Sequence, residues 1–288
     1  MPRIAIATAS ELPHLDEDGP LLLDALARVA VDAEPTVWDD ASVDWSGFDA
    51  VVVRSTWDYA PRRDAFVAWA HHVEAATRLL NPAAIIQWNT DKRYLGELAA
   101  AGIPTVPTRF VAPGDAVALP GEGEFVVKPT VSAGSRDTAR YDAAEHERAR
   151  AHVAALHEAG RTAMVQPYLD AVDVAGETAL LFIGGAFSHA IRKGPLLLPG
   201  EGFVEGLFAP EEIAPREARE EELALAQRVL AAAPGGGEQL LYARVDLLPG
   251  PDGAPVLIEL EVTEPSLFLE HAQGAADRLA AAIARAVT

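Results

Sequence analysis

The sequence contains no cysteine among its 288 residues, which excludes disulfide bonds, thiolate metal sites and a cysteine nucleophile. It is also poor in cations, because 23 Lys and Arg residues stand against 43 Asp and Glu residues, for a formal net charge of −20. Binding to a phosphate backbone needs clustered Lys and Arg, so this balance argues against a nucleic-acid partner. The sequence also lacks any run of about 18 apolar residues, which argues against a membrane-spanning helix.

The first ten residues form too short an apolar stretch for a secretory signal, so a soluble cytoplasmic protein is the default expectation. Half of the residues, 50%, are hydrophobic, which is enough for a well-packed core. The length predicts roughly two domains of about 150 residues each.

Residues 1–88 alternate between strand and helix patterns, which predicts a parallel sheet flanked by helices. The predicted strands are 3–8, 35–38, 49–53 and 84–87, and the predicted helices are 21–31 and 61–76. In such sheets ligands bind beyond the carboxyl ends of the strands. We therefore look for substrate-binding residues in the loops that follow them.

The loop after the third strand has the unusual sequence RSTWDY, which begins at Arg54. An arginine can bind a carboxylate through two parallel hydrogen bonds, and Trp57 and Tyr59 can wall a pocket. The alternative is a helix entry in which Ser55 or Asp58 is a cap and the aromatic rings lie in the core.

Two strand patterns near the C-terminus, within residues 242–268, carry charged residues in apolar surroundings. Arg244 and Asp246 share one face of the first strand, and Glu259 and Glu261 share one face of the second. If the strands pair, the three carboxylates converge. Buried carboxylates are costly unless they are paired or hold a metal, and Mg²⁺ prefers carboxylate and phosphate oxygens. The alternative is an ordinary hairpin whose glutamates face solvent.

Two lysines lie where a phosphate could bind. Lys92 lies in the first turn of a predicted helix at 89–101, an unfavourable place against the helix dipole unless the residue has a use; the alternative is a solvated surface lysine. Lys128 ends the predicted strand 124–128, and a loop of small residues that includes Ser132 follows it. A cation beside exposed backbone N–H groups is a reasonable phosphate cradle.

The middle of the chain predicts further elements. Strand 163–169 breaks at Pro167 and is either an adenine-binding segment or a plain interdomain linker. A hairpin of strands 176–182 and 186–192 turns at Gly184-Gly185. Further predictions are a mobile loop at 194–206 and helices at 142–160, 215–233, 266–274 and 275–287, with the histidines of helix 142–160 at the surface.

The order of these features resembles the ATP-grasp superfamily, and specifically its glutathione-synthetase-like carboxylate–amine ligases. The resemblance covers most of the chain. It implies a mixed α/β and α+β fold with an N-terminal parallel-sheet substrate domain (1–88), a linker helix and central lid (89–168) and a C-terminal antiparallel-sheet, metal-binding domain (169–288).

The resemblance also implies roles for individual residues. ATP would bind to Lys92, Lys128, Ser132, Gln166, Pro167, Tyr168, Leu169 and Glu177. Two Mg²⁺ ions would bind to Asp246, Glu259 and Glu261. Many relatives have Glu-x-Asn where this chain has Glu259-Leu260-Glu261, a departure that keeps an oxygen ligand and adds negative charge.

The motifs VVRSTWDY, NTDK, SHAIRKGP and ELEVTEPSLF look like the branch that contains the O-ureido-serine cyclo-ligase of cycloserine biosynthesis. The implied activity is an ATP-dependent ligase that activates a small amino-acid-like carboxylate as an acyl phosphate and forms an amide or cyclic amide, with release of ADP and phosphate. Arg244, Lys193 and Arg192 would be catalytic. The substrate would contact Glu11, Asp16, Arg54, Ser55, Thr56, Trp57, Thr263 and Ser266.

Two other functions stay open on the sequence. A small-molecule kinase could share this fold and would leave phosphate on its product. A non-catalytic nucleotide-binding protein would bind ATP without turnover. The resemblance also leaves a homodimer open, because relatives often dimerise.

Overall fold

The structure is a computed structural model that describes residues 1–195, 197 and 212–288. The N-terminal part is a parallel sheet in the strand order β2-β1-β3-β4, as predicted. Helix α1 connects β1 to β2, and α2 connects β3 to β4. The elements are β1 (Arg3–Thr8), α1 (Gly19–Arg28), β2 (Asp32–Val37), β3 (Ala50–Val53), α2 (Arg63–Ala76) and β4 (Arg78–Leu80).

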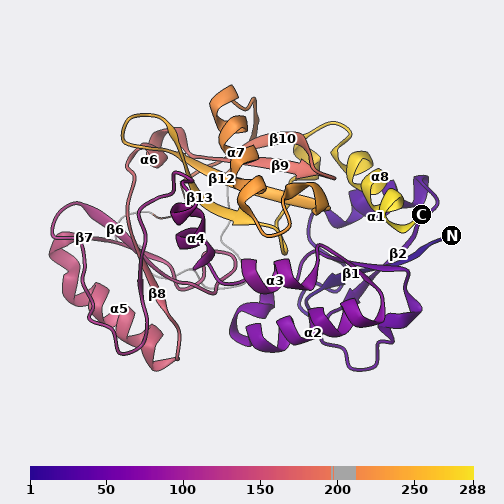
Figure 1. Cartoon of the computed structure of the whole chain (residues 1–288), viewed down its shortest axis with the longest axis horizontal. Coiled ribbons are helices and arrows are strands. Elements are labelled where there is room, and N and C mark those ends of the chain that lie inside the picture. Colours follow the sequence, from indigo (N-terminus) through magenta and orange to yellow (C-terminus); the bar gives the residue numbers. More distant parts are fainter. Residues whose placement is uncertain (196, 198–211) are drawn as a thin grey trace.

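Two antiparallel sheets follow (Figure 1). The lid sheet has the order β5-β8-β6-β7 and carries α5; its elements are β5 (Arg109–Val111), β6 (Glu124–Pro129), β7 (Ala139–Asp142), α5 (His146–Glu158) and β8 (Ala163–Pro167). The C-terminal sheet has the order β11-β10-β9-β12-β13. Its strands are β9 (Glu177–Ile183), β10 (Ala186–Lys193), β11 (Ile213–Arg216), β12 (Tyr242–Pro249) and β13 (Pro255–Glu261), and the helices beside them are α6 (Ala171–Ala175), α7 (Glu220–Ala232) and α8 (Ala275–Val287).

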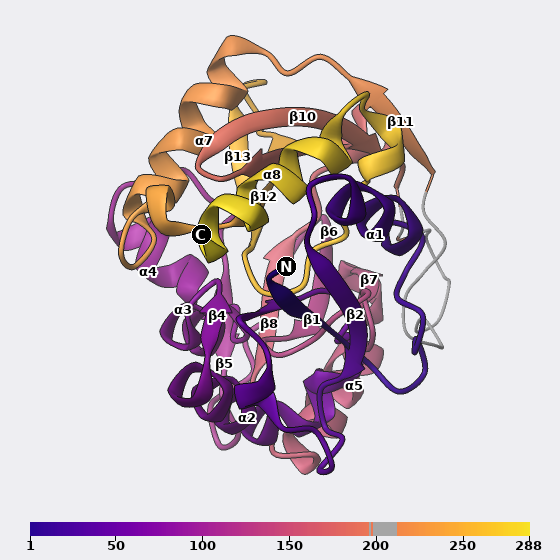
Figure 2. The same cartoon turned by 90° about the vertical axis from the view of Figure 1, so that its right-hand side faces the viewer.

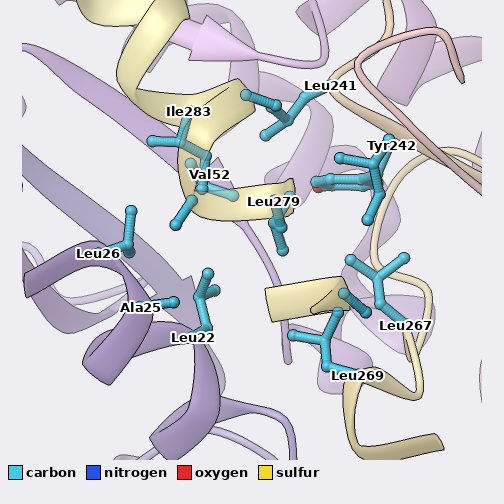
Figure 3. Close-up of a cluster of buried hydrophobic side chains, with 14 of the residues drawn as sticks. Leu22, Ala25, Leu26, Val52, Leu241, Tyr242, Leu267, Leu269, Leu279 and Ile283 are labelled. Carbon is cyan, nitrogen blue, oxygen red and sulfur yellow. The ribbon is translucent and has the colours of Figure 1, made fainter. Parts of the chain in front are cut away.

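A shared hydrophobic core joins the first helix of the chain to the last one. Leu22 and Leu26 of α1 lie in one buried cluster with Leu279 and Ile283 of α8 and with Tyr242 of β12 (Figure 3). Figures 1 and 2 both place α1 beside α8. Each buried leucine contributes about 1.5–3 kcal/mol relative to an exposed one, so this cluster holds the N-terminal unit firmly against the C-terminal sheet.

Several predicted elements were wrong in type or extent. Residues 84–87 belong to the helix α3 (Ala83–Asn89), and the fourth strand is β4. A short apolar run cannot be assigned to strand or helix by its periodicity alone. Residues 213–216 pair with β10 as β11, so α7 begins at Glu220, where three glutamates occupy its first turn. Residues 266–274 contain only a short 3-10 turn at Leu269–His271.

The predicted helix 89–101 is two helices with a turn between them. Helix α3 ends at Asn89 and α4 (Tyr94–Ala100) begins five residues later. The backbone N–H of Lys92 donates instead to the carbonyl of Thr130 in the lid, at 2.8 Å. Lys92 therefore lies in a turn and not in a first helical turn, and this turn connects the N-terminal unit to the lid.

Two predictions concern other parts of the chain. Of the three histidines of α5, only His152 is buried, with 5% of its surface exposed, whereas His146 and His157 are partly exposed. The loop predicted at 194–206 lies mostly outside the described residues. The domain boundaries at 88/89 and 168/169 stay a prediction. Within the described part of the chain, no helix is both long and apolar enough to cross a membrane.

Candidate active site

A cavity of about 850 Å³ is lined by residues of the two antiparallel sheets and by loops of the N-terminal unit. The N-terminal unit contributes the loop after β1 and the ring of Trp57. The lid contributes Lys128 and the segment that follows β8. The C-terminal sheet contributes Lys193 of β10 and charged residues of β12 and β13. The cavity therefore collects most of the residues that the sequence singled out.

The strands β12 and β13 pair as predicted, and their charged residues stand opposite one another. Asp246 is paired with Glu259, and Arg244 with Glu261. A bulge follows, because Leu247 pairs with Leu257 and Ile258 has no partner in the register. Bulges re-aim side chains, and here the successive residues Ile258 and Glu259 both line the cavity while Leu257 is fully buried in the core.

The outer edge of β13 is closed by side chains of the N-terminal part. The Tyr94 hydroxyl accepts from the N–H of Leu260 at 2.9 Å and donates to its carbonyl at 2.8 Å. Asn89 donates to the same carbonyl at 2.7 Å and accepts from the N–H of Val262 at 3.0 Å. An unpaired strand edge would be a liability, and these bonds also fix the strand that carries both glutamates.

Each of the three predicted metal-binding carboxylates meets a cation. Lys92 Nζ lies 3.0 Å from Glu259, and Lys193 Nζ lies 2.9 Å from Asp246. Arg244 contacts both Asp246, at 3.0 Å, and Glu261. Asp246 is 1% exposed and does not line the cavity, because Lys193 and Arg244 lie between it and the open space. The other two carboxylates line the cavity directly.

The pKa values of this cluster follow from burial and from these partners. Burial opposes the ionisation of Asp246, but Arg244 and Lys193 outweigh it and hold the pKa well below its usual range. Burial raises the pKa of Glu261 to about 7, with Arg244 opposing. Burial likewise opposes the ionisation of Glu259, and Lys92 and Lys128 lower its pKa nevertheless. The cluster therefore keeps negative charge at neutral pH.

The donor chemistry of this cluster fits Mg²⁺, because all three groups are carboxylates on two paired strands. Among residues 1–195, 197 and 212–288, however, no three His, Asp or Glu side chains are grouped closely enough to hold a metal ion. Lys92, Lys193 and Arg244 pair with these carboxylates. Lysine and arginine side chains are also suited to binding phosphate.

The predicted nucleotide residues gather at the lid side of the cavity. Lys128, Ser132, Glu177 and the segment 166–169 all line it. Lys92 also donates to the carbonyl of Ser132 at 2.7 Å. Burial lowers the pKa of Lys128, and its ammonium group makes no hydrogen bond to any residue that the structure describes. A desolvated ammonium group that faces a cavity is suited to an anionic ligand.

Side chains of the lid support the segment 166–169, which the sequence predicts to bind adenine. Gln166 is buried and donates to the Thr108 hydroxyl at 2.8 Å. The guanidinium of Arg140 lies 3.5 Å from the centre of the Tyr168 ring. The apolar side chains Val106, Leu248 and Ile258 line the cavity together with this segment. Flat apolar walls beside backbone polar groups are what a purine ring requires.

The predicted substrate residues divide into two groups. Asp16, Trp57 and Ser266 line the cavity. The other five do not, and these are Glu11, Arg54, Ser55, Thr56 and Thr263. Glu11 is exposed, and the Oγ of Ser55 accepts from the N–H of Asp16 at 3.1 Å. Thr263 donates to the Asn89 side chain at 3.1 Å, which makes it part of the support of β13.

Arg54 is the largest departure from the prediction, because its side chain is buried and its partners are protein groups. It donates to the carbonyl of Pro265 at 2.7 Å and lies 3.6 and 3.5 Å from Asp16 and Asp18. It therefore joins the loop after β1 to the loop after β13. A 3-10 helix begins at Trp57, but its N-cap is Thr56 and no side chain caps it. Trp57 and Tyr59 both line the cavity, so each of the two interpretations of residues 54–59 describes part of this loop.

Asp18 makes a second connection between the same two loops. Its carboxylate accepts from the N–H of Leu267 at 3.0 Å and from that of Leu269 at 2.6 Å. Phe268, between them, has a φ of 50°, in the left-handed region. Its ring lines the cavity and lies 5.6 Å from the guanidinium of Arg244. Backbone strain in a non-glycine residue persists only where the surroundings enforce it.

Arg192 is also outside the site. Successive residues of a strand point to opposite faces, so Lys193 lines the cavity while Arg192 donates to the carbonyl of Ala175 at 2.8 Å. The sequence analysis did not propose Glu264 or Phe268, although both line the cavity. The signal for Glu264 was present in the sequence, because an acid interrupts an otherwise uncharged stretch, VTEPSLF.

Comparisons with known proteins agree with this arrangement. The family described as "D-cycloserine synthetase DcsG, N-terminal domain" matches residues 4–81. The cycloserine biosynthesis protein DcsG of Streptomyces lavendulae is 43% identical over 293 residues, which cover 98% of this chain and 97% of that protein. A crystal structure of D-cycloserine synthetase DcsG has a TM-score of 0.91 at 41% identity, covering 99% of this chain and 100% of the other.

More distant structures share the fold alone. A D-alanine–D-alanine ligase from Bacillus anthracis complexed with ATP has a TM-score of 0.66 at 12% identity, covering 100% of this chain and 97% of its own. The ATP-grasp ligase PsnB, complexed with a minimal precursor, Mg and ADP, has a TM-score of 0.60 at 16% identity, covering 99% and 97%. ATP-grasp homologues thus bind nucleotide and Mg. The chain described here belongs to the DcsG family of ATP-grasp ligases.

Proposed function

We propose that this ligase cyclises O-ureido-serine to cycloserine and couples the reaction to the cleavage of ATP into ADP and phosphate. The observation that supports this most strongly is the 43% identity to the cycloserine biosynthesis protein, which extends over 98% of the chain. The cavity supports it independently, because lysine and arginine side chains, carboxylates, Trp57 and Ser266 all line one space.

The position of each residue in the cavity suggests which part of the nucleotide or which ion it would bind. Lys92 and Lys128 would bind the nucleotide phosphates, and residues 166–169 would hold the adenine. Asp246, Glu259 and Glu261 would hold two Mg²⁺ ions, which supply charge neutralisation to the phosphate oxygens when bound. As the lysines turn toward phosphate, their carboxylate partners become available, so nucleotide and metal binding would support each other.

The proposed reaction balances in three steps. A carboxylate oxygen of the substrate attacks the γ-phosphorus of ATP, and the bond to ADP breaks, which gives an acyl phosphate. The nitrogen that is bonded to oxygen in the substrate then attacks the acyl carbon, and inorganic phosphate leaves with the electron pair. Finally, water removes the carbamoyl group from the ring nitrogen as carbamic acid. Arg244 and Lys193 would stabilise charge on the transferring group.

The test is ADP release with Mg·ATP and a panel of O-ureido-D-serine, O-ureido-L-serine, D-serine and D-alanine, followed by mass spectrometry. We expect turnover with one O-ureido-serine enantiomer, free phosphate, and a product lighter than the substrate by carbamic acid. A product that is heavier by a phosphoryl group would establish a kinase instead. ATP binding without turnover on the whole panel would refute the proposed substrate.

A homodimer is the assembly we propose, and it rests on the resemblance to dimeric relatives alone. Light scattering coupled to size-exclusion chromatography measures the mass directly. A mass equal to that of one chain over a range of concentrations would refute it.

A further inference from the structure

One carboxylate in the cavity differs from the others in its surroundings. The buried and half-buried acids that line the cavity include Asp16, Asp18, Glu177, Glu259 and Glu261, and each of them lies within ion-pair distance of a cation. Glu264 also lines the cavity, but it has no ion pair with any residue that the structure describes. Among the described residues it therefore differs from these five acids in having no ion pair.

Contacts from the N-terminal unit hold Glu264 in place. Its backbone carbonyl accepts from the indole N–H of Trp57 at 2.9 Å. The next carbonyl, of Pro265, accepts from Arg54 at 2.7 Å. The Tyr59 hydroxyl interacts with the Glu264 carboxyl itself. A side chain that is this well supported and yet not ion-paired is arranged for contact with a ligand.

We propose that Glu264 accepts the proton of the nitrogen nucleophile when the amide bond forms. This inference rests on the proposed function. The ureido nitrogen bonds to the acyl carbon, the bond from that carbon to the phosphate oxygen breaks, and phosphate leaves with the electron pair. The proton of the nitrogen passes to a carboxylate oxygen of Glu264 and from there to solvent.

The chemistry requires such a group. A nitrogen beside a carbonyl is a poor nucleophile while it keeps its proton, and a positioned base typically contributes about 10²–10⁴-fold to the rate. No histidine is found among the described residues that line the cavity. The other half-buried acids are held by lysine or arginine, and Glu259 and Glu261 are assigned to the metal.

The acid–base character of Glu264 agrees with this placement. Burial, followed by the nearby carboxylate of Glu261, raises its pKa to about 8. Lys92 and the Tyr59 hydroxyl act in the opposite direction, and Glu259 adds to the rise. A base works best when its pKa lies close to the working pH, so Glu264 can both accept a proton and return it.

The test separates the two chemical steps. Glu264→Gln keeps the size of the side chain and removes its basicity. Hydroxylamine is largely unprotonated near neutral pH, and it traps an acyl phosphate as a hydroxamate without help from a protein base. We expect ring closure by Glu264→Gln to fall at least about 100-fold in kcat. Hydroxamate and ADP formation with the same substrate should stay close to the wild-type rates.

Matched variants complete the experiment. Glu158→Gln changes an exposed acid of α5 outside the cavity and should leave both rates unchanged. Glu264→Asp keeps a carboxylate and should retain part of the ring-closure rate. Because hydroxamate formation requires a folded and ATP-competent site, it also serves as the folding control.

Three results would overturn the inference. Equal loss of ring closure and hydroxamate formation would place Glu264 in activation or in folding. A raised substrate KM with unchanged kcat would make it a binding residue only. Unchanged ring closure would show that it has no role in the step. The wild-type assay comes first, because absence of the cyclic product there would refute the proposed function independently of any Glu264 variant.

Discussion

The two walls of the cavity use their charged residues in opposite ways. On the strands β12 and β13, Glu259 and Glu261 point into the cavity and are held by cations that a phosphate can draw away. In the loop after β3, Arg54 points into the protein and is held by Asp16 and Asp18. On our proposal the ion pairs of β12 and β13 take part in the reaction, whereas those of Arg54 hold two loops of the protein together.

The difference teaches that burial alone does not identify a functional charge. What separates the two walls is the position of the cation. Lys92 and Arg244 line the cavity and can exchange a carboxylate for a ligand, whereas Arg54 is enclosed behind Asp16 and Asp18, so its pairs can only be broken. Removing one partner of an enclosed pair leaves an uncompensated charge, which costs about 3–5 kcal/mol.

The largest effect is expected at the cavity wall. Glu259→Gln removes the negative charge that faces the phosphates and should lower kcat about 10³-fold, because phosphoryl transfer depends more on charge stabilisation than on any other effect of the protein. Steady-state ADP release measures the loss, and thermal unfolding checks that the protein remains folded. Turnover within a few-fold of wild type would remove Glu259 from the metal site.

The enclosed pair should respond in stability instead. Arg54→Met leaves Asp16 and Asp18 buried without their cation, so we expect the free energy of unfolding to fall by about 3–5 kcal/mol. Urea denaturation measures it. Arg28→Met, which removes an exposed ion pair with Asp277, is the control and should cost less than about 1 kcal/mol. A substrate KM that rises without loss of stability would restore Arg54 to the substrate site.

A smaller effect on stability is expected from pH, through the buried His152 of the lid. Burial lowers the pKa of His152 from 6.5 to about 4. Between these values the unfolded chain binds a proton that the folded chain does not, so stability falls as the pH falls, by about 1 kcal/mol per pH unit. His152→Gln should therefore lose less stability than wild type between about pH 7 and about pH 5. The exposed His72→Gln should follow wild type.

The smallest effect on kcat is expected at Arg192, whereas a large effect is expected at its neighbour Lys193. Arg192→Gln removes hydrogen bonds to the backbone carbonyls of Ala175 and Val174 and should leave kcat within about twofold. Lys193→Gln leaves Asp246 without one of its two cations and should reduce kcat by about 100-fold or more. Equal losses from both variants would mean that β10 does not present alternate faces to the cavity.

The sequence was sufficient where a rule is local. The alternation of side chains along a strand predicted that Arg244 and Asp246 face Glu259 and Glu261, and the register has these residues opposite one another. The parallel N-terminal sheet followed from the strand–helix alternation in the same way. Both rules act within a few residues, so no distant partner is needed to apply them.

The sequence was insufficient where partners are distant. Arg54 looked like a substrate residue because its acids, Asp16 and Asp18, lie in an earlier loop. The partners of Asp18, Leu267 and Leu269, lie about 250 residues further along the chain. Glu264 was missed for the same reason, since Trp57 and Tyr59, which contact it, lie about 200 residues earlier in the sequence.

The packing of α1 against α8 has a consequence for the synthesis of the protein. The apolar face of α1, with Leu22 and Leu26, emerges from the ribosome early, and Leu279 and Ile283, which cover it, are among the last residues made. During nearly all of translation the nascent N-terminal unit therefore exposes a hydrophobic surface, and such surfaces promote aggregation. A chain that ends before α8 lacks the residues that cover this surface, so the N-terminal unit depends on the last helix for its own burial.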